Sequence, residues 1–362
     1  MLFALATGYG TAEQREHACA CVEAGLPLKV AAEVLGLPLW LRRIPAQALT
    51  TTLPEIPLDA EFSVAVASRM PSDAQEAACW LGRIVHSLKV VGRDFALWIA
   101  KCPRLPATYA PEDDFHWLTA WAWHGAHPGT PGHALLRRPW SPGMAWKRAR
   151  DEVGLWRKRI DLAASLGGGV RDPWFADGSA LGLEFVALRS VHDFIAESTA
   201  MENCLDQYAP HLAYGRVRVF SVRRNGRSIA NLELSLRSDD ATMPVIAQLR
   251  GPRNRRVSTK VWQAAHAWLG SQRFKPLARQ PITPAGARDC LHRLWRPYMD
   301  ALRAAGLRQR FEPRLFGSPP LPQRTTSPSE LRSSAETTIA ATPAGTRLRL
   351  GLACTADDQR SA

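Results

Sequence analysis

The sequence comprises 362 residues and carries a formal net charge of +13, with a pI near 9.9. Hydrophobic residues account for 46% of the chain and thirteen residues are tryptophan, so the composition excludes a wholly disordered protein and allows two folded domains. The basic balance favours a polyanionic partner, with nucleic acid ahead of an anionic membrane surface or an acidic protein. Because GC-rich coding also raises the arginine content, charge alone does not decide the function.

The cysteine and hydrophobic patterns indicate a cytoplasmic protein. Seven cysteines are present without a Cys-x-x-Cys pair, which argues against a disulfide scaffold and against a disulfide-linked partner. The sequence contains neither a signal-type hydrophobic region nor an apolar run approaching the roughly 18 residues of a membrane span. No Gly-x-Gly-x-x-Gly follows a predicted strand, so no nucleotide cofactor is expected. The bacterial cytoplasm is therefore the expected location.

Residues 1–170 are predicted to form a helical domain. Asp73 stands at the start of a long periodic segment that is expected to remain helical past Gly92. A further helix opens after Pro111, where acidic residues suit the positive end of the helix dipole. The next helix is expected to start at Pro142, because proline is favoured at the first helical position.

Two features of this helical part resemble functional sites. The triple glycine at 167–169 lacks the lysine and the spacing of a phosphate-binding loop, so it is interpreted as a helix stop and linker. Three of four nearby histidines crowd a loop rich in Trp, Gly and Pro, but no carboxylate or thiol lies beside them at ligand spacing, and no metal site is predicted. The sequence leaves open the role of His116, His124, His127 and His133.

Three runs in the second half of the chain predict a three-stranded antiparallel meander. The runs at 217–222 and 229–236 are rich in β-formers and flank the tetrapeptide 224–227. Its central Asn-Gly supplies the positive φ values of a type I′ turn, which is the strongest short-range signal for a hairpin. A third run at 244–249 follows and completes the meander.

Helices are predicted on both sides of the meander in the sequence. A capping box formed by Ser190 and Asp193 opens a helix. A second helical stretch is expected to carry Cys204 and Tyr208 four residues apart on one face. After the meander, Ser258 caps a third helix. The fold class is therefore α+β, with helices covering a face of the sheet.

The last part of the chain changes in composition. Residues from 284 to about 310 are predicted to be helical, and residues 317–362 are rich in Ser, Thr, Pro and Ala and are expected to be disordered. We therefore expect a helical N-terminal domain at 1–170, an α+β module with a C-terminal helix at 171–316, and a disordered tail at 317–362.

Several separated motifs around the meander resemble one known family. In chain order they are Glu197, the run Met201-x-Asn203-Cys204-x-x-x-Tyr208, Gly215 before a strand, the strand Ala230-Asn231-Leu232-Glu233-Leu234, and Gln248-x-Arg250-Gly251-x-x-Asn254. Over roughly residues 180–270 this order resembles the PcfJ-like family, which occurs on conjugative plasmids and other bacterial mobile elements. One departure is Asn231, where the family pattern leads us to expect threonine. The family has no established biochemical activity, so the resemblance implies a genomic context and a candidate site but no reaction.

The first functional hypothesis is a nucleic-acid-associated accessory factor of a mobile or conjugative element. Arg216 and Arg218 alternate with valines in the first strand, so the two arginines are predicted to share one face of the sheet. A sheet with one basic face can lie against a phosphate backbone, and each phosphate contact adds to the salt dependence of binding. The other predicted contacts are Arg223, Arg224, Arg227, Arg253, Arg255 and Arg256.

The alternative hypothesis is a cysteine-dependent enzyme acting on an unknown substrate. A thiol at Cys204 becomes nucleophilic when a neighbouring group lowers its pKa, and His192 and His211 flank it in sequence. Glu197 is the candidate acid or base, Gln248 could donate to an oxyanion, and Arg250 could bind an anionic group. Asn203, Tyr208 and Asn254 are expected to complete a cleft between the strand end and the Cys204 helix. Ordinary packing of Cys204 competes with this role, and a protein-interaction adaptor, with a protein of the mobile-element system as its partner, is the third candidate.

Overall fold

The structure is a computed structural model, and it describes residues 9–38, 40–45, 56–57, 59–102, 112–167, 169–236, 242–273, 275–277 and 284–307. The tail predicted to be disordered, at 317–362, lies outside the described residues, and so does Gly168 of the triple glycine. None of the helices in these ranges is long and apolar enough to cross a membrane. The six cysteines within the same ranges are all free thiols.

Seven α-helices precede the sheet in the described part of the chain, as the periodicity predicts. They are α2 (Ala12–Glu23), α3 (Leu28–Val34), α4 (Ala60–Arg69), α5 (Ala74–Val90), α6 (Arg93–Lys101), α7 (Glu112–Ala126) and α8 (Trp146–Leu166), with short 3-10 turns η1 (Leu41–Arg43) and η3 (His133–Leu135). Asp73 caps α5 through its side chain, which accepts a hydrogen bond from the amide of Glu76 at 2.8 Å.

Two of the predicted helix boundaries in this part are wrong. The long segment does not continue through Gly92, because this glycine takes a φ of 126° and separates α5 from α6. The helix expected from Pro142 begins only at Trp146, after a turn in which the amide of Met144 donates to the carbonyl of Ser141. The helix stop at Gly167 is confirmed, since this residue ends α8 in the left-handed conformation with a φ of 51°.

A tryptophan-rich core joins α7, α8 and the late helix α12 (Pro284–Ala304). Trp156 of α8 meets Trp117 of α7 at 5.7 Å and Trp295 of α12 at 5.6 Å, both edge to face. The buried face of α12 also contributes Tyr298, which is fully buried. The last helix of the described chain therefore packs on α7 and α8, far away in sequence.

The sheet has five antiparallel strands in sequence order, so the prediction of three strands is wrong in number. The predicted meander is present as β3 (Val217–Arg224), β4 (Arg227–Ser235) and β5 (Val245–Arg250). A preceding hairpin of β1 (Gly178–Ala180) and β2 (Leu183–Ala187) adds two strands beside β3. The tight turn between β3 and β4 is confirmed, with φ values of 50° at Asn225 and 73° at Gly226.

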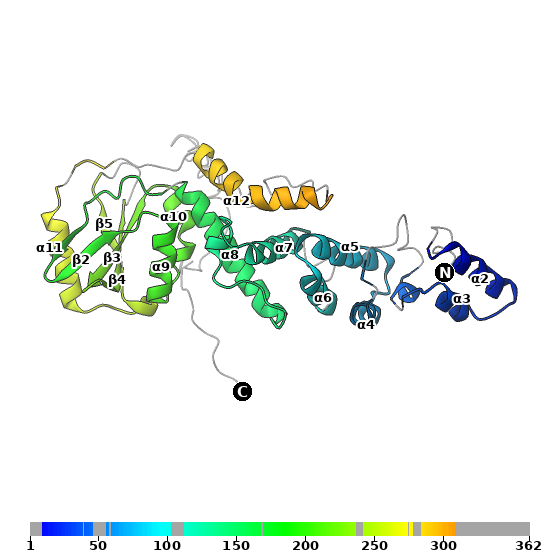
Figure 1. The fold of residues 1–362 in the computed structure, drawn as a ribbon. Coiled ribbons are helices and arrows are strands. Elements are labelled where there is room, and N and C mark those ends of the chain that lie inside the picture. Colours follow the sequence, from blue (N-terminus) through cyan, green and yellow to red (C-terminus); the bar gives the residue numbers. More distant parts are fainter. Residues whose placement is uncertain are drawn as a thin grey trace, which may run out of the picture. The chain divides into compact units, whose positions relative to one another are not determined.

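Helices cover both faces of this sheet (Figure 1). On one face α11 (Thr259–Ser271) packs its buried Trp268 against Phe185 with stacked rings 4.7 Å apart, and against Phe220. On the other face lie α9 (Val191–Met201) and α10 (Ala209–Ala213), whose apolar residues form a separate cluster with Val217 and Val219 of β3. The strand alternation thus gives each face its own core.

The helix predictions around the sheet are correct at two helix starts and wrong for one stretch. The capping box of Ser190 and Asp193 is present at the start of α9, and Ser258 is the N-cap of α11. The prediction of a second helical stretch, expected to carry Cys204 and Tyr208, is wrong, because Glu202 ends α9 with a φ of 48° and only a 3-10 turn, η4 (Leu205–Gln207), follows before α10. Cys204 and Tyr208 therefore do not share the face of a helix.

Candidate functional site

A row of polar side chains crosses the sheet on the face that α9 covers. Ser221 of β3 lies opposite Asn231 of β4, which lies opposite Arg250 of β5. In the next row of the same face Glu233 lies opposite Gln248. Because successive residues of a strand point to opposite faces, the apolar neighbours of these side chains turn instead into the core under α11. The site is therefore a polar face of β4 and β5 beside α9.

A hydrogen-bond relay connects α9, β4 and the loop after α9. The carboxylate of Glu197, only 4% exposed, accepts from the Asn231 amide at 2.6 Å and from the Ser228 hydroxyl at 2.9 Å. The oxygen of the same Asn231 side chain accepts from the Asn203 amide at 2.6 Å. Asn203 in turn accepts from the backbone amide of Leu205 at 3.2 Å. The Asn231 side chain thus supplies a donor and an acceptor that reach two different side chains.

We expect the Asn231→Ala variant to lose about 1–2 kcal/mol of unfolding free energy, because it removes a donor to the buried Glu197 carboxylate and an acceptor for Asn203. Urea unfolding followed by circular dichroism measures this loss. The Asn231→Thr variant serves as the control and should lose less, since a hydroxyl can still donate to Glu197. Equal stability of all three proteins would show that the relay contributes nothing to the fold.

The loop that carries Cys204 is held from two sides. Beneath it, the buried Arg159 of α8 donates to the buried Asp206 of η4 at 2.9 Å. Above it, the Tyr208 hydroxyl donates to the Glu233 carboxylate of β4 at 2.7 Å. Cys204 itself is half-buried and directly precedes η4. These contacts place Asn203, Cys204 and Tyr208 beside the polar row of the sheet.

The segment after β5 folds back on itself and forms the other border of the site. The amide of Gly251 donates to the carbonyl of Arg255 at 2.8 Å, and Arg250 pairs with Arg256 as an isolated antiparallel bridge. The turn requires left-handed conformations at Arg253 and Asn254, with φ values of 54° and 58°. Asparagine is one of the residues that adopt this conformation most readily, so Asn254 is explained by the turn.

A bidentate ion pair joins this turn to the end of α9. The Arg253 guanidinium donates to the two carboxylate oxygens of Glu202 at 2.7 and 3.1 Å. Both side chains are 60% exposed, so the pair positions the turn more than it stabilises the fold.

The positions of His192, His211 and Glu197 lend little support to the enzyme hypothesis. His192 lies in the first turn of α9, and nine residues at 1.5 Å each place it about 14 Å along the helix from the end that precedes Cys204. The ring of His211 lies against Tyr208, with ring centroids 5.1 Å apart. Glu197 is held in the relay with Asn231, while Gln248 and Arg250 are exposed on β5. The catalytic role of Cys204 stays a prediction.

The prediction of an exposed basic face on β3 is wrong for Arg218, which is buried and only 6% exposed. Its guanidinium lies 4.7 Å from the ring of Trp174 and donates to the carbonyl of Asp172 at 2.6 Å. Burial lowers the pKa of Arg218 to about 10. Arg216, half-buried, precedes the same end of β3. These two arginines therefore do not form an exposed basic surface. Arg223, further along β3, is also half-buried, and its guanidinium donates to the Ser221 hydroxyl at 3.1 Å.

The remaining predicted arginines are all exposed and lie at the opposite end of the sheet. Two flank the hairpin turn between β3 and β4. Because β5 is antiparallel to β4 and Arg250 lies opposite Asn231, the end of β5 is about 13 Å from that turn. We name this surface the arginine rim, and its members are Arg224, Arg227, Arg250, Arg253, Arg255 and Arg256.

The four histidines pack as part of the tryptophan-rich core and its surroundings. His124 is fully buried, its Nδ1 lies 2.9 Å from the Thr130 hydroxyl, and burial lowers its pKa to about 3. His127 stacks on Trp123 at 4.1 Å, and the Nδ1 of His133 lies 2.9 Å from the carbonyl of His124. His116 contacts the ring of His86 at 5.6 Å. Within the described ranges, no group of three or more His, Cys, Asp or Glu side chains could hold a metal ion.

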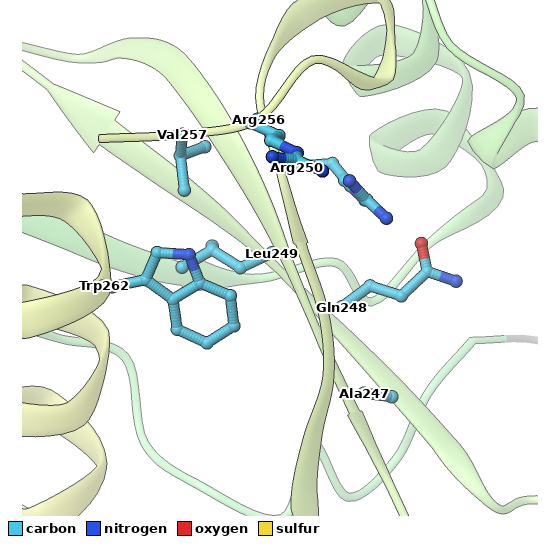
Figure 2. A pocket seen from close by; sticks show the side chains of 7 residues that line it. All are labelled: Ala247, Gln248, Leu249, Arg250, Arg256, Val257 and Trp262. Atoms are coloured by element: carbon cyan, nitrogen blue, oxygen red, sulfur yellow. The ribbon is translucent and has the colours of Figure 1, made fainter. Parts of the chain in front are cut away.

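Sequence reasoning missed one feature of the site, a hollow at the outer edge of β5 to which α11 contributes Trp262 (Figure 2). Trp262 is a large apolar residue of α11, yet it is 36% exposed. The sequence offers one indication of this exposure. Trp262 directly follows Val261, and successive side chains of a helix point about 100° apart.

The fold and the site define an α+β module in which a five-stranded antiparallel sheet lies between α9 and α10 on one face and α11 on the other. Residues 178–265, from the first residue of β1 into α11, match the family model described as PcfJ-like protein. This match confirms the resemblance for that segment. Comparison with curated proteins and comparison with solved structures each found no match.

Proposed function

We propose that this protein is a nucleic-acid-associated accessory factor of a bacterial mobile or conjugative element. The observation that carries the proposal is the arginine rim, in which six exposed arginines from two separate segments gather at one end of the sheet. The resemblance to the PcfJ-like family supplies the mobile-element context.

The charge balance of the rim supports a phosphate backbone as the ligand. Among the described residues, Arg253 has an ion pair with Glu202, and Arg255 helps to lower the pKa of that carboxylate without pairing with it. The other four rim arginines have no ion pair with a described residue. Exposed guanidinium groups without a carboxylate partner remain available for phosphate oxygens, to which arginine binds in a bidentate manner. Contacts of this kind position a protein on nucleic acid without reading its sequence.

The test is fluorescence anisotropy with labelled single- and double-stranded oligonucleotides across a salt series, using the full chain. A triple variant with Arg224, Arg227 and Arg255 changed to Ala should bind more weakly. Its plot of log affinity against log salt should be less steep by about 2–3, because each phosphate contact contributes roughly 0.7–0.9 to the slope. Binding should survive Cys204→Ser, which separates this function from thiol chemistry.

A matched variant controls for the loss of net charge. Arg288, Arg293 and Arg296 of α12 are also exposed, and changing them to Ala removes the same three charges away from the rim. The control should keep the wild-type slope. Absence of binding at low salt, or an equal loss in both triple variants, would overturn the proposal.

A further inference from the structure

A hollow of about 270 Å³ opens along the outer edge of β5, the last strand of the sheet. Trp262, Val257 and Leu249 line one side of β5, and Gln248 lies on the other side, next to Arg250 and Arg256 (Figure 2). The hollow thus has an apolar half and a half that is polar and cationic. The edge of the strand runs between the two halves.

The two arginines of the cationic half form no ion pair with another described residue. Arg250 and Arg256 face each other across the isolated bridge, and Figure 2 shows their side chains lying together. Both are exposed, and neither guanidinium has an ion pair or a side-chain hydrogen bond with another described residue. Two like charges held side by side repel each other, so an anionic group placed between them relieves the repulsion and accepts from both.

The apolar half presents the flat side chain of Trp262. Among the tryptophans in the described ranges it is the only exposed one, with 36% of its side chain accessible. The ring of His266 stacks against it at 5.8 Å and 27° between the planes, so Trp262 enters the hollow as one member of an aromatic pair. Exposed aromatic rings of this kind are the surfaces on which unpaired bases stack.

The edge of β5 supplies hydrogen-bonding groups between the two halves. Within the described chain the outer side of β5 is paired at Arg250 alone, through the bridge to Arg256. The remaining outward backbone groups and the exposed Gln248 amide offer donors and acceptors of the kind that recognise the edge of a base.

We infer that the hollow binds one unpaired nucleotide of a single strand, with the phosphate on Arg250 and Arg256 and the base against Trp262. A nucleotide has the same two halves as the hollow, a planar base and an anionic sugar phosphate. An acidic peptide would satisfy the two guanidinium groups but would leave the aromatic pair without a partner. The inference rests on the proposed function and deepens it, because a base held in a duplex must first leave its stack and its pairing.

The decisive comparison uses two labelled strands of equal length and charge, an oligothymidylate and an abasic oligonucleotide. Anisotropy at constant salt should show the full chain binding the base-bearing strand roughly 5- to 160-fold more tightly, the gain expected for one stacked base. Trp262→Ala should remove this gap and leave the affinity for the abasic strand unchanged. Trp262→Phe, which keeps an aromatic face, should restore most of it.

A second exposed apolar residue provides the matched control. Met243 is 52% exposed and does not line the hollow, so Met243→Ala should keep the full gap between the two strands. Equal affinity for the two strands, or a gap that persists in Trp262→Ala, would overturn the inference while rim-dependent binding kept the proposed function intact. Loss of all oligonucleotide binding at low salt would contradict both the inference and the proposed function. Binding of a glutamate-rich peptide that requires Trp262 would likewise assign the hollow to a protein partner and overturn the inference.

Discussion

Replacing Asp206 with Ala should lower the free energy of unfolding by about 3–5 kcal/mol. Asp206 and Arg159 are 4% and 3% exposed, and their side chains meet at 2.9 Å between α8 and η4. The guanidinium also donates to the carbonyl of Leu135 at 3.2 Å. Removal of the carboxylate therefore leaves a buried positive charge with one neutral acceptor, and that uncompensated charge is the source of the loss.

Urea unfolding of the full chain measures this effect, and a neighbouring ion pair supplies the control. Arg157, on the same helix, binds Asp114 at 3.2 Å, but the two side chains are 43% and 50% exposed. Asp114→Ala should therefore cost at most about 1 kcal/mol, because exposed pairs are screened by solvent. If the two aspartate variants lose equal stability, the burial of the Arg159 pair has no energetic consequence.

A double variant separates the charge from the contact. Changing Arg159 to Met together with Asp206 to Leu removes both charges and refills the space, so it should recover most of the stability lost by Asp206→Ala. The double variant would also test whether the Arg159–Asp206 pair positions the loop of the candidate site. η4 carries the loop from Cys204 to Tyr208, and the Tyr208 bond to Glu233 should persist only where η4 keeps its place.

The parts of the fold that the sequence predicts are those fixed by neighbouring residues. The Asn225-Gly226 turn and the capping box of Ser190 and Asp193 depend on contacts within four residues, and both are present. The left-handed conformation of Glu202 has no such signal, because glutamate carries no preference for it. The end of α9 and the position of Cys204 therefore had to come from the structure.

The parts that the sequence does not predict depend on residues far apart in the chain. The packing of α12 on α7 and α8 rests on contacts such as Trp156 with Trp295, which periodicity cannot specify. Strand alternation correctly put Arg218 on the opposite face from its valine neighbours. It could not show that Trp174 and Asp172 bury that face. The same limitation applies to the hollow, since only the folded chain brings Trp262 of α11 to β5.

The second large effect is expected at Gly132, where the addition of one methyl group should cost about 3 kcal/mol. The backbone of this residue has ordinary helical angles, with φ of −69° and ψ of −30°, so alanine is conformationally acceptable. The difficulty is space. A Cβ atom at this position would lie 2.6 Å from the Cε1 and Nδ1 atoms of His124.

Neither the His124 ring nor the backbone of Gly132 can move aside easily. The His124 ring is fully buried among the aromatic side chains of the core and is held to Thr130 at 2.9 Å. The carbonyl of Gly132 accepts from the indole Nε1 of the buried Trp156 at 2.9 Å, which fixes the backbone on the other side. A clash between two fixed groups in a close-packed interior must shift the backbone or force a side chain away from its preferred rotamer.

Gly143 offers a matched substitution eleven residues further along the chain. A Cβ atom there would meet no other atom within 4 Å, and the residue is exposed. Gly143→Ala should therefore be neutral or stabilise the protein by about 0.4–1 kcal/mol, because alanine restricts the unfolded chain. The midpoints of urea unfolding should move in opposite directions for the two alanine variants, or move only for Gly132→Ala. Equal midpoints would mean that the His124 ring yields without cost, and that the aromatic core around α7 and α8 is less tightly packed than its contacts indicate.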